Sequence, residues 1–200
     1  LADGSAPDDG RMQVTSNSTF DVEFASPSAR VFVNAGGGTD VLNAASLDSL
    51  FAGSVVLNSG SGNDSISAAG IWVKSLFVGG SGNDNLTGSD LNDTIVGGAG
   101  DDSANGLGGD DYIWMGAGDE AHGGDGKDTI RGGSDEDRLS GDVGNDVILG
   151  DSGNDHLLGG TEDDWLHGGA GSDSFEGGEG YDTMLGGSGG ADIVVDSIDG

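Results

Sequence analysis

The sequence has no cysteine, two prolines and only six basic residues against 36 acidic ones, so the formal net charge of the 200 residues is −30. Without cysteine, neither a disulfide bond nor a thiolate metal site can form. The shortage of lysine and arginine excludes nucleic-acid binding through phosphate contacts. No apolar run approaches the roughly 18 residues of a membrane span. Such a composition indicates either a disordered chain or a fold whose charge is compensated from outside the polypeptide.

The spacing of the 43 glycines favours a fold. Residues 79–185 form twelve consecutive repeats, eleven of nine residues and one, residues 115–122, of eight. Position one is usually glycine, position six is always acidic, and position eight is usually a sizeable apolar residue. A disordered chain has no reason to keep an apolar residue two places after each acid.

The repeat itself predicts a coil. Glycine at positions one, two and four permits positive φ and a tight turn. Positions seven to nine then form a short strand whose side chains alternate between the two faces, with position eight inside. Two repeats therefore make one coil with two turns and two parallel strands. In the eight-residue repeat this alignment places Glu120 at position six and His122 at the inward position, as a local defect.

The nonapeptide resembles that of the RTX (repeats-in-toxin) family, G-G-x-G-x-D-x-U-x with U apolar, over more than half of the chain. The resemblance implies an all-β fold, a right-handed parallel β-helix/β-roll solenoid with calcium ions in its turns. Calcium takes carboxylate and carbonyl oxygens, and the family pattern places each ion between the turns of repeats i and i+2. About ten or more ions are expected, fewer where Leu91, Asp135 and Glu162 replace glycine and where Glu120 stands in the short repeat. The position-six ligands are Asp84, Asp93, Asp102, Asp111, Glu120, Asp128, Asp137, Asp146, Asp155, Asp164, Asp173 and Asp182, followed by Asp192 in a thirteenth unit.

Residues 31–78 carry related but wider repeats, with Asp40, Asp64 and Asp84 spaced 24 and 20 residues apart. We expect wider β-helix coils there, each with one RTX-like turn, and Asp40 and Asp64 as further calcium ligands. The predicted organisation is an N-terminal linker with capping strands (1–30), the wider coils (31–78), the β-roll (79–195) and a C-terminal continuation or truncated end (196–200).

Catalytic motifs are missing. The sequence contains no H-E-x-x-H, and its one G-x-S-x-G match, residues 186–190, lies in the glycine-rich repeats and not at a strand-to-helix elbow. Paired acids such as Asp110–Asp111 could mimic a glycosidase site, but one member of each pair belongs to the acidic ladder. The sequence therefore predicts a protein that is not an enzyme, with calcium ions as partners, no nucleic acid and no membrane span.

One predicted sheet face carries large apolar side chains outside. These are Tyr112, Trp114, Val147, Leu149, Trp165 and Leu185. Exposed apolar patches usually mark interaction surfaces, so this face could pack on another protomer, a neighbouring domain or a ligand. Alternatively, these residues serve only the strand propensity of β-branched and aromatic side chains.

Two functional hypotheses follow. In the first, the chain is an extracellular or cell-surface calcium-binding module, a spacer or an interaction module that folds on calcium binding. In the second, it is the non-catalytic export and folding module of a larger RTX enzyme or toxin. An extracellular location fits both, because extracellular modules bind calcium at about 10⁻⁴–10⁻³ M, and because the RTX resemblance implies type I secretion of an unfolded chain.

Overall fold

The computed structural model describes residues 30–44 and 53–195. The described chain is a parallel β-solenoid with strands and turns and no helix, which confirms the predicted all-β class. None of it forms a helix long and apolar enough to cross a membrane. The predicted linker and capping strands before Arg30, the arc within residues 45–52 and the end at 196–200 lie outside the described residues.

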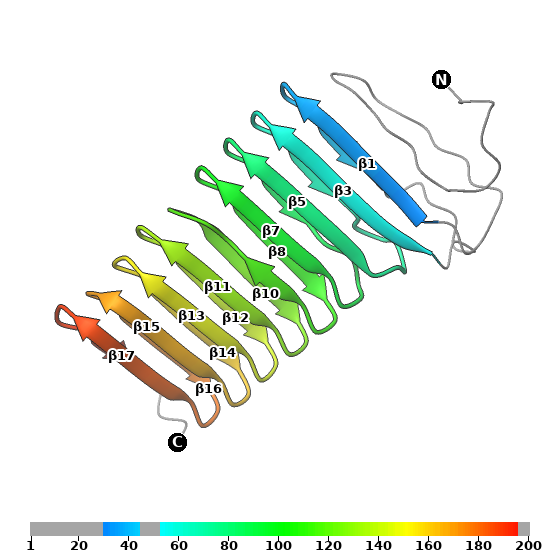
Figure 1. Ribbon diagram of the computed structural model, residues 1–200. Coiled ribbons are helices and arrows are strands. Elements are labelled where there is room, and N and C mark those ends of the chain that lie inside the picture. Colours follow the sequence, from blue (N-terminus) through cyan, green and yellow to red (C-terminus); the bar gives the residue numbers. More distant parts are fainter. Residues whose placement is uncertain (1–29, 45–52, 196–200) are drawn as a thin grey trace, which may run out of the picture.

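Two parallel nine-stranded sheets, here called sheet A and sheet B, form the walls of the solenoid. Figure 1 shows the strands of sheet A side by side in sequence order, with strands of sheet B behind them. Sheet A consists of β1 (Arg30–Gly37), β3 (Ser54–Ser61), β5 (Ser75–Ser81), β7 (Thr94–Ala99), β9 (Tyr112–Trp114), β11 (Thr129–Ser134), β13 (Val147–Ser152), β15 (Trp165–Gly171) and β17 (Thr183–Gly189). Sheet B consists of β2 (Val41–Asn43), β4 (Ser65–Ser67), β6 (Asn85–Thr87), β8 (Ser103–Gly108), β10 (Glu120–Asp125), β12 (Arg138–Val143), β14 (His156–Thr161), β16 (Ser174–Glu179) and β18 (Ile193–Val195).

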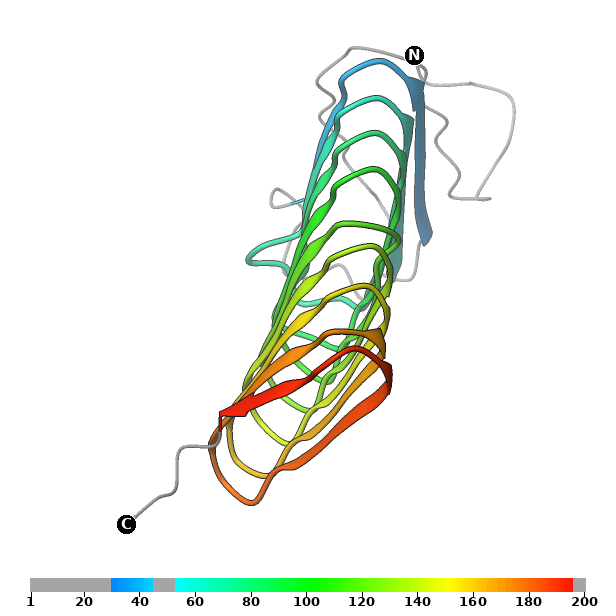
Figure 2. The same ribbon diagram turned by 90° about the vertical axis from the view of Figure 1, so that its left-hand side faces the viewer.

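The coil length falls along the chain. β1 pairs with β3 at an offset of 24 residues, as in Arg30↔Ser54, and β3 pairs with β5 at 20, as in Val55↔Ser75. The later coils have 18 residues, except the one that contains the short repeat, where Trp114 pairs with Arg131 at an offset of 17, and the last, where Ser174 pairs with Ile193 at 19. Figure 2 shows the coils stacked into one flattened tube. The two sheets run through both kinds of coil without interruption.

A thin core fills the tube. In each regular coil, each sheet contributes one inward side chain, so a column of buried residues runs along the tube. The column of sheet A is Val33, Leu57, Phe77, Ile95, Ile113, Ile130, Ile148, Leu166 and Met184. The column of sheet B is Leu42, Ile66, Leu86, Ala104, Ala121, Leu139, Leu157 and Phe175, and it ends at Val194, which is 54 % exposed in the last strand.

The inward residue of the short repeat is Ala121, which is fully buried, and the prediction of an inward His122 was wrong. Ala121 pairs with Ala104 and with Leu139 in the neighbouring strands. Because strand side chains alternate between faces, the shift by one residue turns both Glu120 and His122 outward.

Candidate metal centre

An aspartate precedes nearly every strand, and its side chain is buried where the turn enters the strand. We call the turns that lead from sheet A to sheet B the AB turns, and the opposite ones the BA turns. The AB turns hold Asp40, Asp64, Asp84, Asp102, Asp119, Asp137, Asp155, Asp173 and Asp192. The BA turns hold Asp93, Asp111, Asp128, Asp146, Asp164 and Asp182. All of them are at most 4 % exposed except Asp182 and Asp192. This aspartate ladder brings together residues that are 17 to 24 positions apart in the sequence.

The first carboxylate oxygen holds neighbouring coils together. The backbone N–H of Asp128 donates to Oδ1 of Asp146 at 2.7 Å, and the N–H of Asp146 donates to Oδ1 of Asp164 at 2.8 Å. The same bond repeats along the AB turns, as from Asp137 to Asp155 at 3.0 Å. The ladder carboxylates from Asp64 to Asp192 thus each accept a charge-assisted hydrogen bond, which is stronger than a neutral one.

The second oxygen, Oδ2, is buried and accepts no hydrogen bond in most of the ladder. This holds for Asp64, Asp84, Asp102, Asp111, Asp128, Asp137, Asp146, Asp155, Asp164, Asp173 and Asp182. A buried carboxylate oxygen without a partner is costly, because its charge has lost water and gained nothing. So many equivalent orphaned atoms indicate a missing positive partner rather than isolated defects.

Glycine at position one leaves a space beside Oδ2, and oxygen atoms line this space. A Cβ on Gly132 would lie 3.0 Å from the carbonyl oxygen of Gly150 and closer still to Oδ2 of Asp137. A Cβ on Gly123 would likewise lie 2.8 Å from the carbonyl oxygen of Gly141 and closer still to Oδ2 of Asp128. Glycine at position one thus leaves room where a carboxylate and a carbonyl of the next coil converge.

Burial raises the pKa of the ladder carboxyl groups from Asp84 to Asp164, and in most of these groups the negative charge of neighbouring carboxylates raises it further. The pKa is about 8 for Asp111 and about 7 for Asp137 and Asp164. It is about 6 for Asp102, Asp128, Asp146 and Asp155. Near neutral pH, the ladder therefore needs either protons or cations to be stable.

The donor set fits a hard cation. Carboxylate and carbonyl oxygens suit calcium, which takes six to eight oxygens at about 2.3–2.6 Å in flexible geometry, whereas magnesium keeps its water and demands an octahedron. Within residues 30–44 and 53–195, no three acidic or histidine side chains converge on one point. An ion in these turns would therefore take many of its ligands from backbone carbonyls.

The short repeat places Asp119, not Glu120, in the ladder, so the sequence-based placement of Glu120 was wrong. The backbone N–H of Asp102 donates to Oδ1 of Asp119 at 2.6 Å, and that of Asp119 to Asp137 at 2.8 Å. The missing residue lies in the turn, so the acid enters one place earlier while the strand keeps its alternation. The sequence does contain a signal for this shift: in Glu-Ala-His, Ala121 is the apolar residue, so it is the one expected to point inward.

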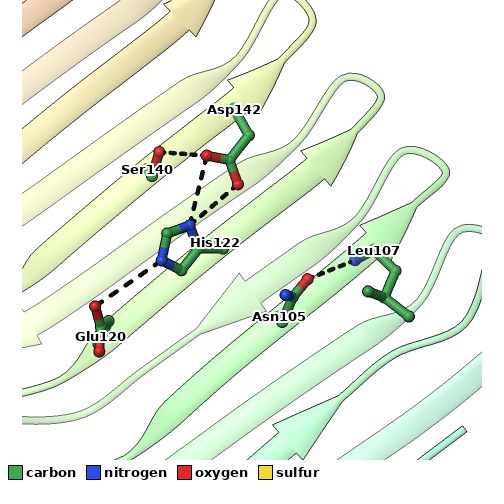
Figure 3. A network of polar contacts seen from close by, with 6 residues as sticks. All are labelled: Asn105, Leu107, Glu120, His122, Ser140 and Asp142. Atoms are coloured by element: carbon green, nitrogen blue, oxygen red, sulfur yellow. Dashed lines mark hydrogen bonds and ion pairs between the residues drawn. The ribbon is translucent and has the colours of Figure 1, made fainter. Parts of the chain in front are cut away.

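Glu120 and His122 instead join a polar network on the outer face of sheet B (Figure 3). His122 Nδ1 lies 3.1 Å from Oδ2 of Asp142, and its Nε2 lies 3.9 Å from Glu120 Oε1. Ser140 Oγ donates to Asp142 Oδ1 at 2.7 Å. No sequence pattern predicts this contact, because Asp142 stands at position two, where the consensus has glycine, and adopts φ 73°.

Two of the irregular repeats keep the turn intact. Asp135 and Glu162 replace the glycine of position four and adopt φ 70° and 76°, the left-handed region that glycine favours. The ladder residues that follow them, Asp137 and Asp164, still have a buried Oδ2 without a partner. The substitutions cost backbone strain but leave the donor set open.

The wide coils share the ladder but differ at position one. The N–H of Asp40 donates to Oδ1 of Asp64 at 2.7 Å. Position one, however, holds Ala35 and Ser59 in place of glycine, and Ser59 Oγ donates to the carbonyl oxygen of Gly79 at 2.9 Å. Side chains thus occupy space that is open in the later coils.

The family model for the RTX calcium-binding nonapeptide repeat matches residues 76–90, 87–120, 122–157, 149–184 and 158–194, more than half of the chain. The chain belongs to this family. Its repeats bind calcium, and the family generally serves as a structural calcium-binding domain whose members are typically secreted. No curated protein and no solved structure matches the chain. Membership of a calcium-binding repeat family agrees with the oxygen-lined, negatively charged ladder described above.

Proposed function

We propose that this chain is an extracellular module that folds when calcium fills its ladder, and that it then acts as a rigid spacer and interaction surface. The observation that carries the proposal is the row of buried Oδ2 atoms without hydrogen-bond partners. We place the sites in the turns whose first position is glycine, from Gly79 onward, because only there does the space beside Oδ2 remain open.

The chain's own residues account for the conditional fold. The hydrogen bonds from backbone N–H groups to Oδ1 fix the stacking of the coils, and glycine lets the turns approach closely. In the regular coils the core has one side chain per strand, so hydrophobic burial alone is small for the number of residues ordered. Calcium supplies two positive charges per ion and accepts the carboxylate and carbonyl oxygens of the turns.

The interaction surface is the outer face of sheet A, and its proposed occupant is a second copy of this chain. Its two outward rows contain no Asp or Glu, although the chain has 36 of them, and the acidic side chain of Asp151 beside these rows is paired with Arg131. The first row is Phe32, Val56, Leu76, Thr94, Tyr112, Thr129, Val147, Trp165 and Thr183. The second row is Asn34, Asn58, Val78, Val96, Trp114, Arg131, Leu149, His167 and Leu185.

The distribution of charge permits a second copy to bind on sheet A. Two chains of charge −30 repel each other wherever acids face acids, and the outer face of sheet B carries Glu120 and Glu176. On sheet A, Tyr112, Trp114 and Leu185 are 43 %, 48 % and 46 % exposed. Apolar contact without like-charge repulsion is therefore available to two copies on this face.

A calcium titration tests the folding proposal. The chain is dialysed against EGTA at pH 7.5, calcium is added, and circular dichroism and light scattering follow folding. We expect little β structure in EGTA, a cooperative gain of β structure with calcium, and full reversal when EGTA returns. A chain that is already fully folded in EGTA at this pH would refute the proposed mechanism.

A further inference from the structure

Two aspartates of the ladder differ from the rest because protein donors already occupy their second oxygen. They are Asp93, the first aspartate of the BA turns, and Asp119, in the middle of the AB turns. Neither has an orphaned Oδ2, in contrast to Asp111 and Asp137, which follow them one coil later.

At Asp93 the donors come from Ser89. The backbone N–H and Oγ of Ser89 donate to Oδ2 of Asp93 at 2.6 and 2.8 Å, while the N–H of Ser75 donates to Oδ1 at 2.6 Å. Position two in the regular turns has positive φ, as in Gly80 and Gly98, whereas Ser89 does not. The turn of this repeat, which also has Leu91 in place of glycine, thus turns its own donors toward the carboxylate.

At Asp119 the donor comes from the shortened turn. The N–H of Gly116 donates to Oδ2 of Asp119 at 2.6 Å. Ala117 pairs with Ser134, so Met115 stands at position one, where the neighbouring coils have Gly97 and Gly132. Met115 is only 2 % exposed. A donor thus occupies Oδ2, and a residue with a side chain replaces the glycine that keeps the adjoining space open.

We infer that Asp93 and Asp119 are calcium-free positions of the ladder, at which protein N–H and O–H donors take the place of the ion. Donors compensate a buried carboxylate at a fixed place and need no ion. The row of calcium sites in the BA turns therefore begins only at Asp111, and the row in the AB turns is interrupted at Asp119. The inference rests on the proposed calcium function and refines it by assigning which turns bind.

The test counts calcium ions per chain by equilibrium dialysis and atomic emission on the full chain. Asp119→Asn and Ser89→Ala should bind as many ions as the wild type. Asp137→Asn, the matched change one coil later in the AB turns, should lose at least one ion. If Asp119→Asn loses as many ions as Asp137→Asn, the inference is overturned.

A gain of binding provides a test that does not depend on a damaged fold. The double substitution Ser89→Gly and Leu91→Gly restores G-G-D-G-N-D at residues 88–93 and removes the Oγ donor. We expect this variant to bind one ion more than the wild type; an unchanged count contradicts the calcium-free assignment of Asp93. If the wild type itself binds no calcium, the proposed function fails, which is a different result from a wrong assignment of positions.

Discussion

Asp128 and Asp146 lie 18 residues apart, yet the backbone N–H of Asp128 donates to Oδ1 of Asp146 at 2.7 Å. This bond separates the two duties of each carboxylate: Oδ1 joins the coils, and Oδ2 faces the space where oxygens converge. A substitution that keeps an oxygen but removes the charge should therefore affect calcium more than stacking.

Asp128→Asn is that substitution. The amide oxygen can still accept from Asp111, but the charge beside the proposed ion is lost, so we expect at least one calcium ion fewer. Loss of one charge-assisted interaction costs about 1.5–3 kcal/mol, which lowers the melting temperature in calcium by roughly 3–12 °C for a chain of this size. Asp125→Asn is the matched control, since Asp125 is exposed in the same turn. Equal effects of the two variants would show that net charge, not ligation, is responsible.

Replacing the glycine at position one should weaken calcium binding and stability, whereas replacing a nearby glycine should not. A Cβ on Gly106 would press against Oδ2 of Asp111 and the carbonyl oxygen of Gly123, whereas a Cβ on Gly108 would have its nearest neighbour at 3.8 Å. Neither glycine has a positive φ that would strain alanine. We expect Gly106→Ala to raise the calcium midpoint and to cost about 1–3 kcal/mol, and Gly108→Ala to be neutral or slightly stabilising. Calcium titrations followed by circular dichroism compare the two, and equal midpoints would argue against an ion beside Gly106.

The metal-free chain should be more stable in mild acid than at slightly alkaline pH. The pKa of Asp111 is raised from 3.8 to about 8, and those of Asp137 and Asp164 to about 7, mainly by burial. A raised pKa in the folded state means that the folded chain holds more protons than the unfolded one between about pH 4 and pH 8. The stability that this proton uptake provides is complete below pH 4 and is lost as the pH rises through 6 to 8.

Circular dichroism in EGTA from pH 5 to pH 8 measures this effect, with light scattering to detect aggregation. We expect β structure to decrease as the pH rises. In saturating calcium the trend should reverse, because calcium needs deprotonated ligands and protons compete with it. Asp111→Asn should show a weaker pH dependence in EGTA than Asp125→Asn, since Asp125 is outside the ladder. A metal-free chain whose structure does not change over this range would contradict the role of the buried carboxyl groups.

The repeat made most of this fold predictable. In most repeats an apolar residue follows the acidic residue two positions later. This spacing predicts Asp128 before the strand and Ile130 inside it, and both are buried as expected. The short repeat was harder, because counting forward from glycine gives Glu120 and His122, whereas the strand itself is set by burial of Ala121. Where a residue is missing, inward packing determines the register, and the turn adapts to it.

Contacts that depend on turn conformation could not be predicted from the sequence. The consensus treats positions two and four as glycine, so it contains no rule for the donors of Ser89 or for the contact of Asp142 with His122. These bonds depend on whether a peptide N–H turns inward or outward, and the local sequence does not encode that choice on its own.

The final prediction concerns the outer face of sheet A, where the acidic side chain of Asp151 is paired with Arg131. Arg131 lies 5.8 Å from the ring centre of Trp114, and Trp165 stacks on His167 at 5.8 Å, so aromatic rings gather on this face. In calcium we expect a dimer, and Trp114→Ser combined with Trp165→Ser should weaken association at least tenfold, because buried tryptophans commonly contribute about 2 kcal/mol or more. Leu158→Ser, an outward apolar residue on sheet B, is the matched control and should leave association unchanged. Sedimentation velocity measures the three proteins, and a wild type that stays monomeric in calcium at high concentration would refute this interface while leaving the calcium ladder untouched.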